Sequence, residues 1–113
     1  MADERNKPLW QPGSERIAAA NLTRFMAEAN ARWKTGARTY ADLYGWSVSK
    51  PEQFWRSVWD FGGVIGESGG TVLADGGKMP GAHYFPEARL NYAENLLRRR
   101  DEHDAMVFHG EDK

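Results

Sequence analysis

The distribution of glycine divides this chain of 113 residues into two parts with different folding rules. Eight of its twelve glycines lie between residues 62 and 81. Glycine loses more backbone entropy on folding than any other residue, so a segment this rich in it favours loops and short strands. We therefore expect helices before residue 62 and mostly irregular backbone just after it.

The part before the glycines begins with an expected extended arm, residues 1–13, in which two prolines and a glycine prevent a helix. Residues 14–33 predict one long helix with Ser14 as its N-cap, because apolar residues recur there on one helical face. Gly36 is expected to end this helix. The apolar face comprises Ala18, Leu22, Phe25, Met26, Ala29 and Trp33.

A short second helix is predicted from a capping signal. Thr39 is followed three residues later by Asp42, a pair that can bond the free N–H groups of a first helical turn. Gly45 is expected to stop this helix. Trp46 then falls in a non-helical segment, where it would anchor a loop.

A third helix has the clearest start in the sequence. Residues 49–52 read Ser-Lys-Pro-Glu, which predicts Ser49 as N-cap, an early proline and an acidic partner in the first turn. The helix is expected to run to about Phe61, and the glycines at 62 and 63 supply a left-handed end. Its apolar face is wide and includes Phe54, Trp55, Val58, Trp59 and Phe61.

Fewer elements are predicted after residue 62. Residues 71–74 favour a short strand closed by a turn, residues 80–86 are irregular, and residues 90–100 favour a helix that ends in three arginines. Residues 105–109 favour a strand that leads into a polar turn. The expected fold class is α+β and mainly helical, with three to four helices and two or three short strands.

The core is expected to be small and aromatic. Leu, Ile, Val and Phe together number only 19, whereas five Trp and four Tyr add large side chains that can be buried. The length suits one domain with room for a core. A formal net charge of only −1 argues against the disorder that a low aliphatic content would otherwise suggest.

Composition also bears on partners and location. Fifteen basic residues balance sixteen acidic ones, so no overall field favours nucleic acid or an anionic membrane. The absence of cysteine from the sequence excludes disulfides, Cys-ligated metal and a thiol nucleophile. The first residues are polar and unlike a secretory signal, so we expect a cytoplasmic protein that contacts neither nucleic acid nor membrane.

No catalytic, cofactor-binding or metal-binding residue is assigned from spacing. The glycine-rich segment follows a helix and precedes a strand, which is the reverse of the order in a phosphate-binding loop. His103, His109 and the surrounding carboxylates straddle a loop, a strand and a turn, so a solvated surface explains them better than a metal site. The sequence around Ser68 lacks the G-x-S-x-G form of a nucleophile elbow.

Several motifs resemble the start of one enzyme family, the acetoacetate:CoA ligases, also called acetoacetyl-CoA synthetases. The resemblance covers nearly the whole chain, and its most specific part is the run from Arg89 to Leu97. Tyr84 and Glu87 depart from the Trp and Gly usual in that family, which puts the local loop packing in question. The motifs that carry the resemblance are Pro8-Leu9-Trp10-Gln11-Pro12, Ser14-Glu15-Arg16-Ile17, Asn21-Leu22-Thr23-Arg24-Phe25-Met26, Trp46-Ser47-Val48, Pro51-Glu52 with Phe54-Trp55, Val64-Ile65-Gly66, Met79-Pro80-Gly81-Ala82, Phe85-Pro86 and Ala88-Arg89-Leu90-Asn91-Tyr92-Ala93-Glu94-Asn95-Leu96-Leu97.

The resemblance implies an adenylate-forming ligase that uses ATP, CoA and Mg. Acetoacetate and ATP would give an acyl-adenylate and pyrophosphate, and the CoA thiol would then displace AMP. The family's catalytic motifs belong to later sequence, so this chain alone is expected to be inactive. It would be the N-terminal cap of such an enzyme, with a helical domain over residues 14–104 and the first strand of the missing adenylation domain at residues 105–113.

The missing adenylation domain would then be the chain's partner, and the fragment is expected to associate with itself through the same apolar surface. An alternative function remains open: a free-standing helical module for protein interaction or oligomerisation, without enzymatic activity. The candidate interface residues are Leu9, Trp10, Tyr84, Phe85, Met106 and Phe108.

Overall fold

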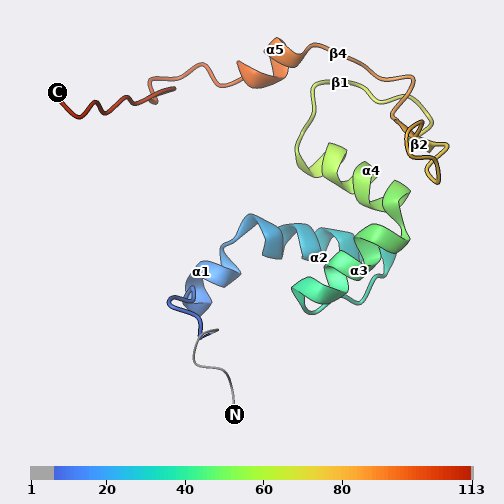
Figure 1. Cartoon of the computed structure of the whole chain (residues 1–113), viewed down its shortest axis with the longest axis horizontal. Helices are drawn as coiled ribbons and strands as arrows, with labels where there is room; N and C mark the ends of the chain where they lie inside the picture. The colour runs from blue at the N-terminus through green and yellow to red at the C-terminus, as the bar shows by residue number, and fades with distance from the viewer. Residues whose placement is uncertain (1–6, 113) are drawn as a thin grey trace.

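The protein is mainly helical with a few short strands, which confirms the expected fold class (Figure 1). The computed structural model describes residues 7–112, so residues 1–6 of the expected arm and residue 113 of the expected last strand lie outside it. The helices are α1 (Ser14–Ala18), α2 (Asn21–Trp33), α3 (Tyr40–Ser49), α4 (Pro51–Phe61) and α5 (Tyr92–Leu96), and the strands are β1 (Gly66–Glu67), β2 (Leu73–Ala74), β3 (His83–Tyr84) and β4 (Arg89–Leu90).

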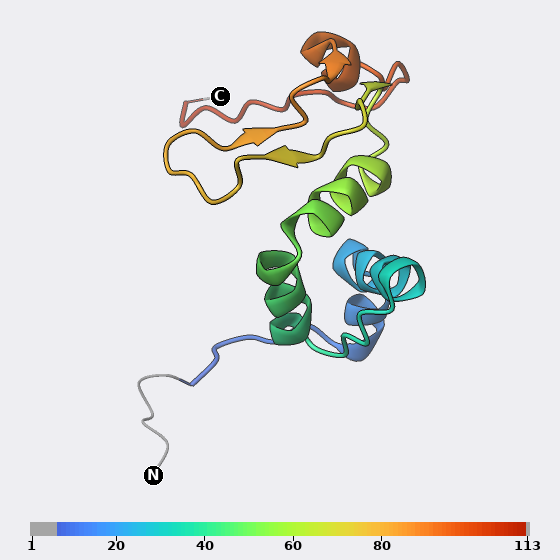
Figure 2. The same cartoon turned by 90° about the vertical axis from the view of Figure 1, so that its right-hand side faces the viewer.

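The arrangement is open rather than compact. The radius of gyration is 19.0 Å, whereas a compact domain of about 100 residues has a value near 13 Å. Figure 2 shows why: α1–α3 form one group, the strands and α5 form another, and α4 lies between the two groups. No helix within residues 7–112 has both the length and the apolar character needed to cross a membrane.

The single helix expected over residues 14–33 is wrong, because the chain breaks between α1 and α2. Ala20 adopts an extended conformation with ψ 144°, and the Thr23 hydroxyl donates to the Ile17 carbonyl at 2.5 Å. A side-chain hydroxyl that takes up a backbone carbonyl competes with the helical ladder. Ser14 is not the N-cap either, because it is the first helical residue and Gly13 occupies the cap without a side-chain bond.

Asn30 shapes the turn that returns the chain from α2 to α3. Its side-chain amide donates to the Ala37 carbonyl and accepts from the Ala37 N–H, each at 2.9 Å. These two bonds satisfy the backbone of a buried residue in a loop, where a missing partner would be costly. Helix α2 itself ends at Trp33, with Lys34 rather than a glycine in the left-handed position at φ 57°.

Helix α3 begins as expected but continues further. The Thr39 hydroxyl accepts from the Asp42 N–H, and the Asp42 carboxylate accepts from the Thr39 N–H, which confirms the capping box. Gly45 does not stop the helix, and Trp46 is a buried helical residue rather than a loop anchor. A mid-helix glycine costs only about 1 kcal/mol, less than the gain from burying a large aromatic side chain.

The N-cap of helix α4 lies one residue later than expected. Ser49 still belongs to α3, where its hydroxyl donates to the Trp46 carbonyl at 3.2 Å, and Lys50 is the N-cap of α4 without a side-chain bond. The expected end at Phe61 is confirmed, and Gly63 takes the left-handed conformation with φ 60°. The two helices therefore follow each other with a single residue between them.

The core is aromatic, as expected, and centres on Phe25. The Phe25 ring lies edge-on to Phe54 and Phe61, with centroid distances of 6.1 and 5.3 Å, and 6.4 Å from Trp46. Such tilted and edge-to-face contacts are the favoured arrangements of aromatic rings. The buried apolar residues are Phe25, Ala29, Ala37, Leu43 and Trp46.

The strands pair in two antiparallel ladders. Gly66 lies opposite Leu90 in β1–β4, and Leu73 lies opposite Tyr84 in β2–β3. A β-carbon at position 66 would lie 2.7 Å from the Arg89 carbonyl oxygen, so this approach requires glycine. β2 covers only the last two residues of the strand expected at 71–74, and β1, β3 and β4 were not expected, since two-residue strands leave almost no pattern in the sequence.

Helix α5 is shorter than the expected helix over residues 90–100, since Leu90 belongs to β4 and Asn91 is the N-cap. The side chain of Asn95 joins α5 to the segment before β1 through two hydrogen bonds, as a paired residue does in a β-ladder. Its amide donates to the Ile65 carbonyl at 2.9 Å, and its oxygen accepts from the Ile65 N–H at 2.8 Å.

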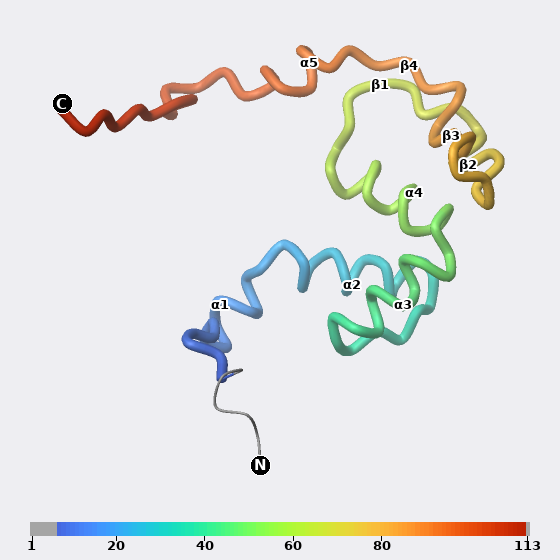
Figure 3. The backbone as a smooth tube through the Cα atoms, viewed as in Figure 1, coloured from blue at the N-terminus to red at the C-terminus, as the bar shows by residue number. Residues whose placement is uncertain are grey.

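Arg98 joins the end of α5 to the end of α4. Its guanidinium donates to the carbonyl oxygens of Gly63 at 2.6 Å and Gly62 at 3.1 Å. Beyond it, residues 98–112 contain neither helix nor strand, and the expected strand at 105–109 pairs with nothing in the described part of the chain. Figure 3 shows this segment leading away from α5.

The capping box predicts a specific loss of stability. Thr39→Ala removes the acceptor for the Asp42 N–H and should lower the free energy of unfolding by about 1 kcal/mol. Urea unfolding followed by Trp fluorescence measures this loss. Ser47→Ala in the same helix is the control, because it removes a hydroxyl that donates to the Tyr44 carbonyl but leaves the cap intact. A loss in Thr39→Ala no larger than that in Ser47→Ala would contradict the role of the cap.

The Asn95 pairing predicts a local effect. Asn95→Asp keeps an acceptor for the Ile65 N–H but replaces the donor that faces the Ile65 carbonyl, so the link should open. Amide hydrogen exchange at Ile65 should become faster, while exchange in α2 and α3 stays unchanged. Unchanged protection at Ile65 would contradict the role given to this side chain.

Candidate functional site

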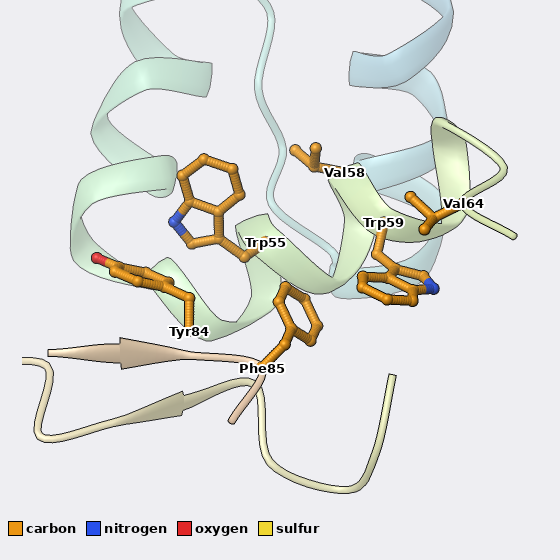
Figure 4. A pocket seen from close by; sticks show the side chains of 6 residues that line it. All are labelled: Trp55, Val58, Trp59, Val64, Tyr84 and Phe85. Carbon is orange, nitrogen blue, oxygen red and sulfur yellow. The ribbon is translucent and has the colours of Figure 1, made fainter. Parts of the chain in front are cut away.

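One apolar surface beside α4 is a groove, which we call the α4–β3 groove. It has a volume of about 330 Å³ and is lined by Trp55, Val58, Trp59, Val64, Tyr84 and Phe85 (Figure 4). Trp55, Val58 and Trp59 come from one side of α4, Tyr84 belongs to β3, and Phe85 follows it. The close-up shows Trp55 above Tyr84 and Trp59 beside Phe85.

Two aromatic contacts hold the two walls of this groove together. The ring centroids of Trp55 and Tyr84 are 5.7 Å apart, and those of Trp59 and Phe85 are 4.8 Å apart. Phe85 has a positive φ of 46°, an unusual conformation for a bulky residue. Its N–H donates to the Val72 carbonyl at 2.8 Å, which fixes this turn against the neighbouring segment.

Arg56 supports the groove from the side of the loop. Its guanidinium lies 5.5 Å from the centre of the Phe85 ring and donates to the Ser68 hydroxyl at 2.8 Å. An arginine over an aromatic face contributes a cation–π attraction in addition to packing. The residues that line the groove include no carboxylate, amine or imidazole, so this surface is suited to packing rather than to proton transfer.

A second apolar surface, the helical groove, lies between α2, α3 and α4. It consists of two adjoining hollows of about 340 and 240 Å³ that share Leu22, Phe25 and Phe54. One hollow extends to Phe61 and the other to Tyr44. The Arg24 guanidinium lies 4.9 Å from the centre of the Phe61 ring, so a cation borders the first hollow.

The six expected interface residues do not form one surface. Tyr84 and Phe85 meet in the α4–β3 groove, whereas Leu9 and Trp10 lie on the N-terminal arm, where the Arg16 guanidinium covers the Trp10 ring at 5.7 Å. Met106 and Phe108 are 93% and 90% exposed on the segment after α5. Their role at an interface stays a prediction.

Sequence reasoning missed that α4 presents two apolar faces. Trp55 and Trp59 were expected to pack in the core, but they line the groove, and Trp55 is 39% exposed. The available signal was the width of the apolar face of α4. Phe54 and Phe61 face the core, the two tryptophans form a second face, and Val58 contacts the core and also lines the groove.

The polar cluster after α5 is a surface feature. Asp101 accepts from the Arg99 side chain at 2.7 Å and from the His103 N–H at 3.1 Å. These bonds, Arg99 first, hold the pKa of Asp101 below its usual 3.8. Within residues 7–112, no group of three or more His, Asp or Glu is arranged to hold a metal ion.

Glu87 organises the glycine-rich loop. Its carboxylate accepts from the Gly70 N–H at 2.9 Å and from the Thr71 hydroxyl at 2.8 Å. These hydrogen bonds, the one from Gly70 first, lower the pKa of Glu87 from its usual 4.5. Glu87, which stands where the acetoacetate:CoA ligases usually have Gly, therefore has a structural role in this chain.

Comparison with known proteins identifies the family. Residues 40–96, from α3 to α5, match the family described as Acetyl-coenzyme A synthetase N-terminus. The chain belongs to this family. The resemblance to acetoacetyl-CoA synthetases seen in the sequence is confirmed as well, and both apolar grooves are formed largely by residues of the matched region.

The relatives of this family member are much longer than the chain. It is 43% identical over 110 residues to the acetoacetyl-coenzyme A synthetase of Rhizobium meliloti (strain 1021), which covers 97% of this chain but 17% of that protein. It is 33% identical over 105 residues to the acetoacetyl-CoA synthetase of Danio rerio, or 91% of this chain and 15% of that protein.

A solved structure agrees with these matches. The acetoacetyl-CoA synthetase from Streptomyces lividans superposes with a TM-score of 0.74 at 45% identity, over 81% of this chain and 14% of that one. The chain thus spans about a sixth of the length of the relatives it matches. The fold described here is therefore shared with the N-terminal region of that synthetase.

The hydrogen bonds to Glu87 predict a titration behaviour. Because the folded pKa is lowered, this carboxylate stabilises the loop fully above about pH 4.5, and the contribution is lost as the pH falls through the folded pKa. Thr71→Val should raise the pKa of Glu87 only part of the way, since the Gly70 donor remains. Carboxyl NMR titration of both proteins measures it, and an unchanged pKa would contradict the Thr71 contact.

Proposed function

We propose that this chain is the N-terminal structural domain of an ATP-dependent acetoacetate:CoA ligase. The whole enzyme would convert acetoacetate, ATP and CoA to acetoacetyl-CoA, AMP and pyrophosphate. The chain itself would carry out no chemical step. Its role would be to pack against the large adenylation domain and complete its surface.

The α4–β3 groove is the observation that carries the docking role. A volume of about 330 Å³ lined by six apolar side chains is an unusual feature to leave in water. Isolated exposed apolar residues need no explanation, but a continuous patch of this kind marks a contact surface. We propose that a segment of the adenylation domain fills it.

The segment after α5 supports the same proposal. Residues 105–109 have the composition of a strand but no pairing partner in the described chain. An unpaired strand edge tends to pair with another strand. We propose that these residues form the first strand of the adenylation domain's sheet.

We propose that residues 7–112, the part that the structure describes, provide no site for the substrates of the ligase. ATP with Mg would need a phosphate-binding loop and oxygen ligands. The glycine-rich segment here follows α4, and Glu87 and Thr71 of that region bond each other. ATP, CoA and Mg are therefore proposed to bind elsewhere in the enzyme, and we assign no step of the reaction to this chain.

The setting of the proposed enzyme follows from its reaction. Activation of a short oxo-acid to its CoA thioester belongs to lipid metabolism, and the proposed compartment is the cytoplasm, because the first residues are polar and unlike a secretory signal. The exposed helical groove also supports the alternative function, a helical module for oligomerisation.

The first test is enzymatic. We expect residues 1–113 alone to give no acetoacetate-dependent exchange of ATP and pyrophosphate above a protein-free blank. Replacing the matched region of the Streptomyces lividans synthetase with this chain should give a chimera that retains the exchange. Exchange by the isolated chain would overturn its non-catalytic role, and an inactive but folded chimera would contradict its place in such a ligase.

The second part of the test concerns the groove. In the chimera, Trp55→Asp together with Tyr84→Asp should lower the yield of folded protein and its exchange activity at least tenfold, because charge would enter an apolar interface. Ile17→Asp is the matched control, since Ile17 is an exposed apolar residue that lines neither groove. Equal behaviour of the two variants would contradict the docking role.

A further inference from the structure

The segment of residues 101–112 combines an apolar centre with acidic flanks. It carries five carboxylates and neither lysine nor arginine, with Met106, Val107 and Phe108 in the middle. In an extended chain, side chains two positions apart lie on the same side. Met106 and Phe108, which are 93% and 90% exposed, therefore present two large apolar groups in one direction.

The helical groove has the complementary character. Its two hollows of about 340 and 240 Å³ adjoin along Leu22, Phe25 and Phe54, so they can receive two neighbouring apolar side chains. The helical part of the described chain, residues 7–61, carries eight basic and five acidic residues. The net charge of this helical part is therefore positive and that of the segment negative, which favours their encounter.

Cations lie close to the hollow that reaches Phe61. The Arg24 guanidinium covers the Phe61 ring at 4.9 Å, and Arg98 is bonded to the carbonyl of Gly62, which also lines this hollow. The α4–β3 groove also has a bordering cation, Arg56 over the Phe85 ring, but it is a single hollow. The helical groove offers two adjoining hollows for the two side chains, and this fit selects it.

We propose that two copies of this chain associate by reciprocal exchange, with Met106 and Phe108 of each copy seated in the helical groove of the other. Each dimer then contains two identical contacts related by a twofold axis. From Leu97 to Met106 the chain can span about 30 Å when extended, which allows the segment to reach a second molecule. The proposal concerns the isolated chain and is independent of the ligase function.

Sedimentation velocity on residues 1–113 tests the association. We expect a species of twice the 12.8 kDa chain mass, with a dimer fraction that falls as sodium chloride approaches 1 M, where charges are screened within about 3 Å. A strictly monomeric protein at millimolar concentration would overturn the proposal. A dimer that salt does not weaken would overturn its electrostatic part.

Substitutions to serine test the contact without changing the charge. Met106→Ser with Phe108→Ser, or Leu22→Ser alone, should weaken the dimer at least tenfold. Val107→Ser and Ile17→Ser are the matched controls, because Val107 lies on the other side of the extended segment and Ile17, 51% exposed against 46% for Leu22, lines neither groove. Circular dichroism checks that all four remain folded.

Mixing the two weakened variants separates exchange from other modes of association. The segment variant keeps an intact groove, and the Leu22 variant keeps an intact segment, so an equimolar mixture should form a heterodimer through one remaining contact. Association by any other face gives no such rescue, and its absence would overturn the proposal. The ligase tests above do not use these variants, so either idea can fail alone.

Discussion

The packing of Phe25 against Phe54, Phe61 and Trp46 is the interaction on which the rest of this structure depends. It joins α2, α3 and α4 through one ring, because few aliphatic residues are available to build a larger core. Since α4 is fixed by this contact on one face, its other face is free to carry Trp55 and Trp59. The strands then attach to α4 through those two residues and Arg56, and not through a core of their own.

The small core and the two-sided packing of α4 explain both the open shape and the two grooves. A chain that places its large apolar residues on both faces of one helix cannot bury both faces by itself. One face is covered in part by α2 and α3, and the other in part by β3 and the turn after it. The surfaces that remain exposed are apolar grooves, and such surfaces favour docking and self-association.

Much of the helical part could be predicted from local signals, and much of the rest could not. The Thr39–Asp42 capping box and the end of α4 at Phe61 depend on neighbouring residues, and both were found. The break at Ala20 goes with a local bond from the Thr23 hydroxyl that no hydrophobic period reveals, and the burial of Trp46 depends on tertiary packing that outweighs local preference. Strands of two residues leave almost no periodic pattern, and the two-sided use of α4 cannot be told from a wide core face.

The bonds from Arg98 to Gly62 and Gly63 have a mechanical consequence. Tension applied to the segment after α5 would reach the guanidinium before it reaches any strand. The force would pass to the carbonyl groups of Gly62 and Gly63, which follow the last residue of α4, and through α4 to the aromatic core. The two-residue ladders would then bear less of the force, because one side chain, and not the sheet, anchors the segment after α5.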